Sequence, residues 1–178
     1  MMDFSQFQKT ATLKDGSVVT IRAIQPEDKS MLSDAFYELD KESRYTRFFG
    51  FKEQVSDEEL KRATEVDFDN QIALVVTTTA DGKEIIIAGG RYFLLTDQSA
   101  GPLRAEIAFT VEEDYQGQGL AGRLFEQLVD IARSKGVSTF EAEVLPQNKA
   151  MLAVFAGRGL PMKKTMADGL IYVTLSLI

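Results

Sequence analysis

Three glycines stand within six residues in the run Gln116-Gly117-Gln118-Gly119-Leu120-Ala121-Gly122. Apolar residues at helical spacing follow, so the run predicts a glycine-rich turn that opens an amphipathic helix. Without Cβ atoms, backbone N–H groups can converge on a ligand, and the helix dipole adds positive potential there. This chemistry favours a phosphate or pyrophosphate group bound by residues 116–122. The alternative is a tight turn that only caps a packed helix.

The same glycines also fit G-x-G-x-x-G, the fingerprint of dinucleotide-binding proteins, with Glu141 or Glu143 about twenty residues further on. The setting argues against that interpretation. Residues 112–116 separate the glycines from the preceding predicted strand, which alternates polar and apolar residues. Too few β-α units follow for a dinucleotide fold. A nicotinamide-binding protein is therefore the lesser alternative.

The residue types present restrict the chemistry further. The 178 residues contain no Cys and no His, so there is no thiol nucleophile and no imidazole base, and we expect no metal site. Acid–base chemistry must rest on Glu, Asp, Tyr, Lys, backbone groups or water. The net charge of −7 argues against a nucleic-acid partner. It is compatible with a basic partner, such as a lysine-bearing protein, and equally with solubility alone.

No apolar run reaches the ~18 residues that a membrane-spanning helix needs, and no signal peptide is visible at the N-terminus. We therefore expect one domain over residues 1–178, located in the cytoplasm and without a membrane partner.

The elements that must position these residues alternate along the chain. Strands are predicted at 18–22, 72–79, 85–95, 103–111, 139–144 and 170–177, and helices at 26–39, 56 onward, 119–135 and 148–157. Ser56 to Glu59 form a capping box, and Asp81-Gly82 predicts a hairpin turn. Hairpins and one β-α-β unit share the chain, which predicts an α/β (α+β) class with a mixed sheet and helices on its faces.

The run from Gln116 to Ala121 matches the Q/R-x-x-G-x-G/A signature of the GNAT superfamily of acyl-CoA-dependent N-acetyltransferases. The segments TLKDGSVVTIRAIQPED, ESRYTRFFG and SDEEL resemble the acetyltransferase domain of bacterial Pat-type protein lysine acetyltransferases, over residues 12–178. The resemblance implies the GNAT fold, a mixed, mostly antiparallel sheet of about six or seven strands flanked by about four helices. Relatives often carry a further synthetase-like or cyclic-nucleotide-binding domain. Neither is found in these 178 residues, so we expect a free-standing version.

The resemblance also implies transfer of an acetyl group from acetyl-CoA to an amine, preferably a protein lysine, directly in a ternary complex. Glu106 would be the general base, with a pKa raised by partial burial; the alternative is a half-exposed charge. Backbone N–H groups of Phe109, Thr110 and Val111, exposed by a bulge, would hold the acetyl carbonyl. Asn148 would contact the cofactor arm, cap a helix, or both.

One position departs from the family pattern. Many relatives carry a Tyr on the last helix that protonates the departing thiolate, where this chain has Phe155 beside the cofactor. Solvent or another residue, such as Tyr115 or Tyr172, could then protonate the thiolate. Alternatively no acid is needed, because a CoA thiol with a pKa of about 8.5 leaves tolerably as thiolate.

The acceptor is left open by the sequence. Residues 42–51, ESRYTRFFGF, are aromatic and basic and would either wall an acceptor channel or pack under the first helices. The competing functions are a small-molecule amine acetyltransferase and a non-catalytic acyl-CoA-binding sensor. Relatives often form dimers, which makes a dimer a further expectation.

Overall fold

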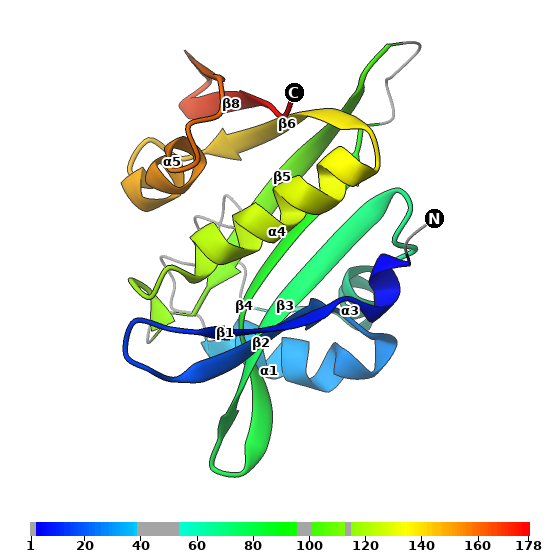
Figure 1. Ribbon diagram of the computed structural model, residues 1–178. Helices are drawn as coiled ribbons and strands as arrows, with labels where there is room; N and C mark the ends of the chain where they lie inside the picture. The colour runs from blue at the N-terminus through cyan, green and yellow to red at the C-terminus, as the bar shows by residue number, and fades with distance from the viewer. Residues whose placement is uncertain (1–2, 39–53, 96–100, 113–114) are drawn as a thin grey trace.

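The computed structural model describes residues 3–38, 54–95, 101–112 and 115–178. Within these ranges one sheet is flanked by four α-helices (Figure 1). The strands are β1 (Gln8–Thr12), β2 (Val18–Ala23), β3 (Gln71–Ala80), β4 (Lys83–Leu94), β5 (Leu103–Val111), β6 (Val137–Val144), β7 (Met162–Ala167) and β8 (Leu170–Ser176). The helices are α1 (Lys29–Glu38), α3 (Asp57–Thr64), α4 (Leu120–Ser134) and α5 (Lys149–Ala156), with short 3-10 turns at Phe4–Gln6 and Pro26–Asp28.

The eight strands follow the order β1-β2-β3-β4-β5-β6-β8-β7. Only the β5–β6 pair is parallel, and every other neighbouring pair is antiparallel. This confirms the predicted mixed, mostly antiparallel sheet. The number of strands is eight rather than six or seven, because β1 and β7 were not predicted. Both are edge strands whose side chains are almost all exposed, so neither carries an apolar alternation that a sequence pattern could detect.

Local signals in the sequence place several element ends. The Ser56 hydroxyl accepts a hydrogen bond from the Glu59 N–H, and the Glu59 side chain bonds back, as in the predicted capping box. Asp81 and Gly82 both have positive φ, 51° and 77°, and turn β3 into β4. Two positive φ values in a two-residue loop match the twist of the flanking strands, which is why an Asp-Gly pair suits this hairpin.

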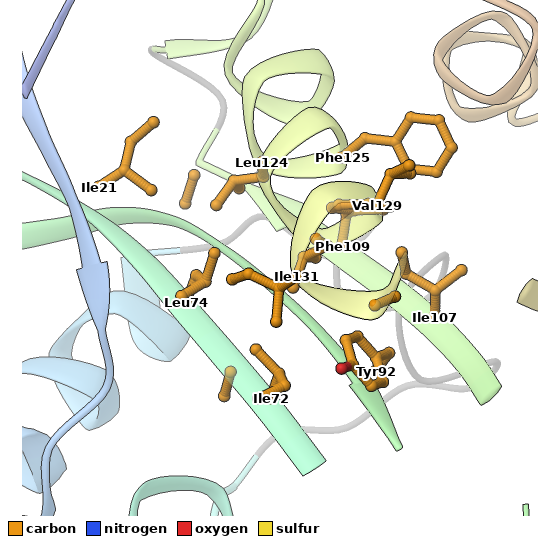
Figure 2. Close-up of a cluster of buried hydrophobic side chains, with 14 of the residues drawn as sticks. Ile21, Ile72, Leu74, Tyr92, Ile107, Phe109, Leu124, Phe125, Val129 and Ile131 are labelled. Carbon is orange, nitrogen blue, oxygen red and sulfur yellow. The ribbon is translucent and has the colours of Figure 1, made fainter. Parts of the chain in front are cut away.

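Helix α4 lies across one face of the sheet and packs its apolar face into the central core (Figure 1). Leu124, Phe125 and Ile131 from this helix pack against Phe109 on β5 and Leu74 on β3, as Figure 2 shows. The apolar stripe of α4 follows helical spacing, so one face of the helix is buried and the other remains in water. Helix α4 thereby covers one face of strand β5.

Side chains of β5 alternate between the two faces of the sheet. Ala105, Ile107 and Phe109 are buried on the α4 side. Arg104 and Glu106, two residues apart, must therefore point to the opposite face, where α1 and α3 lie. Among the helices that the structure describes, none is both long enough and apolar enough to cross a membrane.

Candidate functional site

Strands β5 and β6 separate halfway along their length. Their parallel pairing runs from Leu103↔Val137 to Glu106↔Glu141 and then stops, whereas β5 continues to Val111 and β6 to Val144. The pairing irregularity lies between Leu103 and Arg104, at the start of the paired stretch, and not beside Phe109 where a bulge was expected. The result is a gap in the sheet that opens directly after Glu106.

The backbone of β5 presents hydrogen-bonding groups to this gap. The Leu95 N–H donates to the Arg104 carbonyl, and the Glu112 N–H donates to the Ile87 carbonyl, so even-numbered residues of β5 direct their backbone groups at β4. Residues with odd numbers direct theirs toward β6. Of the three predicted donors, Phe109 and Val111 thus point their N–H groups into the gap, while the Thr110 N–H points at β4.

The gap contains a small cavity of about 70 Å³. Four predicted site residues meet here, since the cavity is lined by Glu106, Phe109, Asn148 and Phe155, together with Ala108 and Met151 among others. Phe155 is 1% exposed, and its ring packs 6.1 Å from that of Phe109 and 5.5 Å from that of Phe125. The cavity therefore has an aromatic wall on the α5 side and a carboxylate at its closed end.

The glycine-rich turn, residues 116–122, follows the carboxyl-terminal end of β5. Gly117 and Gly119 have φ of 83° and 82°, the left-handed conformation that glycine adopts without strain. Gly119 is the N-cap of α4 and offers no capping side chain, so among the described residues no side chain caps the first N–H groups of the helix. Uncapped donors at a helix N-terminus fit a pyrophosphate.

Two glutamines complete this turn. The Gln116 Nε2 donates to the Val111 carbonyl at 3.1 Å, which links the turn to the edge of β5 that faces the gap. The Gln118 Oε1 is buried without a hydrogen-bond partner among the residues that the structure describes. A buried polar atom without a partner is costly unless a ligand or water satisfies it. Both side chains are consistent with a ligand that runs from the turn to the gap.

The other predicted residues of the turn have different roles. The Leu120 side chain is 2% exposed and belongs to the core, so only its backbone N–H remains for a ligand. Ala121 is half-buried. A Cβ added at Gly122 would meet no atom within 4 Å, so protein packing does not require glycine there.

Asn148 combines the two roles that the sequence left open. It is the N-cap of α5, and its Oδ1 accepts a hydrogen bond from the Met151 N–H at 3.2 Å. The same residue also lines the cavity in the gap. The helix-capping role is confirmed, and contact with a cofactor stays a prediction.

A larger cavity, of about 220 Å³, lies on the opposite face between α1, α3 and the central strands. Its wall is mostly apolar, with Glu59, Arg91, Thr110 and Glu112 as polar members. Ala108 lines both cavities, so the two approach each other across β5, next to Glu106. The larger cavity is therefore a candidate entry side for an acceptor group.

Two charged residues at this site were not predicted as functional. Arg104 and Glu141 form an ion pair beside Glu106, and the sequence shows only that Arg104 and Glu106 share one face of an alternating strand. Tyr115 packs against the core, as expected for a loop anchor. Residues 42–51 lie outside the described residues. In the part of the chain that is described, no group of three or more acidic side chains could hold a metal ion.

Comparisons with known proteins agree with this architecture. A model of the acetyltransferase (GNAT) family matches residues 33–160. Acetyltransferase PA5475 of Pseudomonas aeruginosa is 29% identical over 140 residues, which cover 79% of this chain and 73% of that protein. Acetyltransferase Pat of Mycolicibacterium smegmatis is 31% identical over 139 residues, which cover 78% of this chain but only 40% of that protein.

Among solved structures, the GNAT domain of S. lividans PAT superposes with a TM-score of 0.84 at 31% identity, covering 95% of this chain and 96% of that one. The family match and the shared fold both include the β5–turn–α4 unit. The chain therefore belongs to the acetyltransferase (GNAT) family and is an acetyltransferase.

Proposed function

We propose that this chain moves an acetyl group from acetyl-CoA to an amine, preferably the side-chain amine of a protein lysine, by direct transfer in a ternary complex. The observation that supports the proposal is the gap between β5 and β6, where Glu106 and Phe109 line one cavity and Gln116 of the glycine-rich turn bonds to the Val111 carbonyl. The lysine preference is supported by the resemblance to Pat-type protein lysine acetyltransferases and by the similarity to the proteins named Pat.

Acetyl-CoA would supply a thioester, whose carbonyl carbon is open to attack by an uncharged amine. The chain would hold its pyrophosphate with the N–H groups of residues 117–122, where the helix dipole and the uncapped donors act together. The N–H groups of Phe109 and Val111 would bind the arm and the carbonyl oxygen along the gap. Donors fixed in a sheet cost no reorganisation when negative charge develops on that oxygen.

Glu106 would act as the general base. It lines the cavity in the gap, and its side chain points to the face that carries the larger cavity, through which an amine would enter. An ammonium must lose a proton before it can attack, and with no His or Cys in the chain a carboxylate beside the reacting atoms is the simplest acceptor.

The leaving thiolate has no tyrosine beside it at the usual position. Phe155 is buried against Phe109 and Phe125, and a phenyl ring cannot donate a proton. A thiol with a pKa of about 8.5 is a tolerable leaving group without protonation. We therefore assign Phe155 to shaping the cavity and not to acid catalysis.

The test is an assay with acetyl-CoA and a chemically deacetylated bacterial lysate, following both CoA release and acetyl-lysine by mass spectrometry. Glu106→Gln should lose turnover by about a hundredfold or more while it still binds acetyl-CoA. Glu65→Gln is the control, since it removes one carboxylate from a half-exposed ion pair outside both cavities. Full activity of Glu106→Gln would remove the proposed base.

The same assay separates the two other candidate functions. CoA release without acetyl-lysine, restored by small amines, would replace the protein acceptor by a small-molecule amine. Tight acetyl-CoA binding with no transfer to any acceptor would favour the non-catalytic sensor, which Phe155 motivates. The proposal also includes a cytoplasmic location, which cell fractionation would test.

A further inference from the structure

An ion pair joins β5 and β6 at the point where the two strands part. The Arg104 Nη1 lies 2.5 Å from the Glu141 Oε2, and the two side chains are 37% and 35% exposed. In register, Arg104 pairs with Thr139 and Glu106 pairs with Glu141, so the Arg104 side chain reaches diagonally across to the last paired position. The pair therefore ties the strands together at the closed end of the gap.

Glu141 is also the register partner of Glu106 on the neighbouring strand β6. Register partners on adjacent parallel strands lie roughly 4.8 Å apart and direct their side chains to the same face. Two carboxylates thus stand side by side, one in the wall of the cavity and the other held by a guanidinium. Neither cavity includes Arg104 or Glu141 in its wall, so these side chains act on the site from outside it.

We propose that Glu141, held by Arg104, is a positioning residue that sets the pH at which Glu106 ionises. For catalysis this rests on the proposed function, in which Glu106 is the base. A neighbouring carboxylate disfavours the negative form of Glu106, and a neighbouring guanidinium favours it. The ion pair keeps Glu141 in place and offsets part of its charge, so Glu106 can remain ionised near neutral pH and still accept a proton.

Other charged residues among those described line the two cavities next to Glu106. They are Arg91 on β4, Glu112 after the end of β5, Glu143 on β6 and Glu59 on α3. On β4 the register partner of Glu106 is the uncharged Phe93, while Arg91 is opposite Ala108 and donates to the Ala63 carbonyl. Glu112 lies six residues after Glu106, just past the end of β5, about 20 Å away. Arg104 and Glu141 are the charged groups that the register of β5 and β6 places beside Glu106.

The two members of the pair should have opposite effects. Removing the charge of Glu141 leaves Arg104 beside Glu106, which favours the ionised carboxylate. Removing the charge of Arg104 leaves two adjacent carboxylates, which disfavours ionisation. If the ion pair only held β5 and β6 together, both substitutions would shift the ionisation of Glu106 in the same direction, because either substitution breaks the same contact.

The direct test is a carbon-13 NMR titration of glutamate side-chain carboxyls in the full chain, with the Glu106 signal assigned by its loss in Glu106→Gln. We expect Glu141→Gln to lower the titration midpoint of Glu106, and Arg104→Gln to raise it, each by about half a pH unit or more. Glu65→Gln is the matched control, because Lys29 Nζ and Glu65 Oε2 form an ion pair at 3.0 Å with exposures of 37% and 42%. It should leave the midpoint unchanged.

A kinetic readout uses acetyl-CoA and the deacetylated lysate. The acidic limb of kcat/KM against pH should shift in the same two directions, with the Kd for acetyl-CoA unchanged. Unshifted Glu106 midpoints in both variants, or shifts of equal sign, would overturn the inference while leaving the proposed function intact. Full turnover of Glu106→Gln would instead remove Glu106 as the base of the proposed function, and the NMR midpoints would still decide whether the pair controls Glu106.

Discussion

Tyr92 carries a phenol into the core beneath α4, and Figure 2 shows its oxygen among apolar side chains. The hydroxyl has no hydrogen-bond partner among the residues that the structure describes, and burial raises the pKa of the Tyr92 phenol. A buried polar group without a partner is costly, so Tyr92→Phe should raise the free energy of unfolding by about 1 kcal/mol. Urea denaturation checks this, and a clear loss of stability would show that the hydroxyl is in fact satisfied.

Asp67 organises the turn before β3. Its Oδ1 accepts hydrogen bonds from the N–H groups of Asp69, Asn70 and Gln71 at 2.9, 3.0 and 3.1 Å. Burial alone would raise the pKa of Asp67, but these three bonds outweigh it and lower the pKa below the ordinary value of 3.8. A carboxylate with a lowered pKa stabilises the fold above its unfolded-state pKa, and this stabilisation is lost as pH falls through the lowered value.

Asp67→Asn should therefore be less stable than the parent at pH 7, and the difference should shrink as the pH falls below 3.8. An amide oxygen can still accept hydrogen bonds, so the substitution tests the charge. Urea midpoints at pH 7 and pH 3 measure the effect, with the exposed Asp34→Asn as control. A difference that stays constant with pH would contradict this account.

At this scale the sequence was informative where chemistry limits the choice. Without His or Cys, a base had to be a carboxylate or a weaker group, and Glu106 stood on the polar face of an alternating strand. The sequence offers Glu141 only as a candidate acid for a dinucleotide site. That Glu141 lies beside Glu106 is shown only by the register of β5 and β6, because a contact between residues 35 apart is set by tertiary pairing and leaves no local pattern.

Helix α4 begins and ends with glycines in the same backbone conformation. Gly119 at its start and Gly136 after its end both have φ of 82°, and an added Cβ would meet no atom within 4 Å at either position. Alanine in the left-handed region costs roughly 1–2 kcal/mol. Gly119→Ala and Gly136→Ala should thus destabilise the fold to a similar extent.

Only Gly119→Ala should also weaken acetyl-CoA binding, because Gly119 lies in the turn that we assign to the pyrophosphate. Calorimetric titration with acetyl-CoA separates the two effects, with Gly136→Ala as the matched control. Equal affinities in both variants would mean that the turn only shapes the helix end.

Elements were predictable in proportion to how deeply they are buried. The interior elements β3 to β6 and α4 were located from apolar periodicity within a residue or two. The edges β1 and β7 were not, because exposed strands such as Lys163 to Ala167 contain few apolar side chains. The parting of β5 and β6 also left no local signature, and it was inferred only from the family.

For the molecule as a whole, ligand binding should raise thermal stability. A ligand that binds only the folded chain stabilises it by about 2.7 kcal/mol at a hundred times its Kd, which for a chain of this size corresponds to several degrees. Acetyl-CoA should therefore raise the melting temperature in a concentration-dependent manner, and NADPH should not. Differential scanning fluorimetry checks this, and the reverse result would revive a nicotinamide ligand.

The short seam between β5 and β6 also has a consequence for motion. Five strands on one side and three on the other are joined by only four register pairs, backed by α4, which crosses both parts (Figure 1). A cosubstrate arm lying in the gap would take the place of the missing ladder. In hydrogen exchange, the amides of Phe109 and Val111 should exchange quickly in the unliganded chain and slow down once acetyl-CoA is added, as the two parts of the sheet become a single mechanical unit.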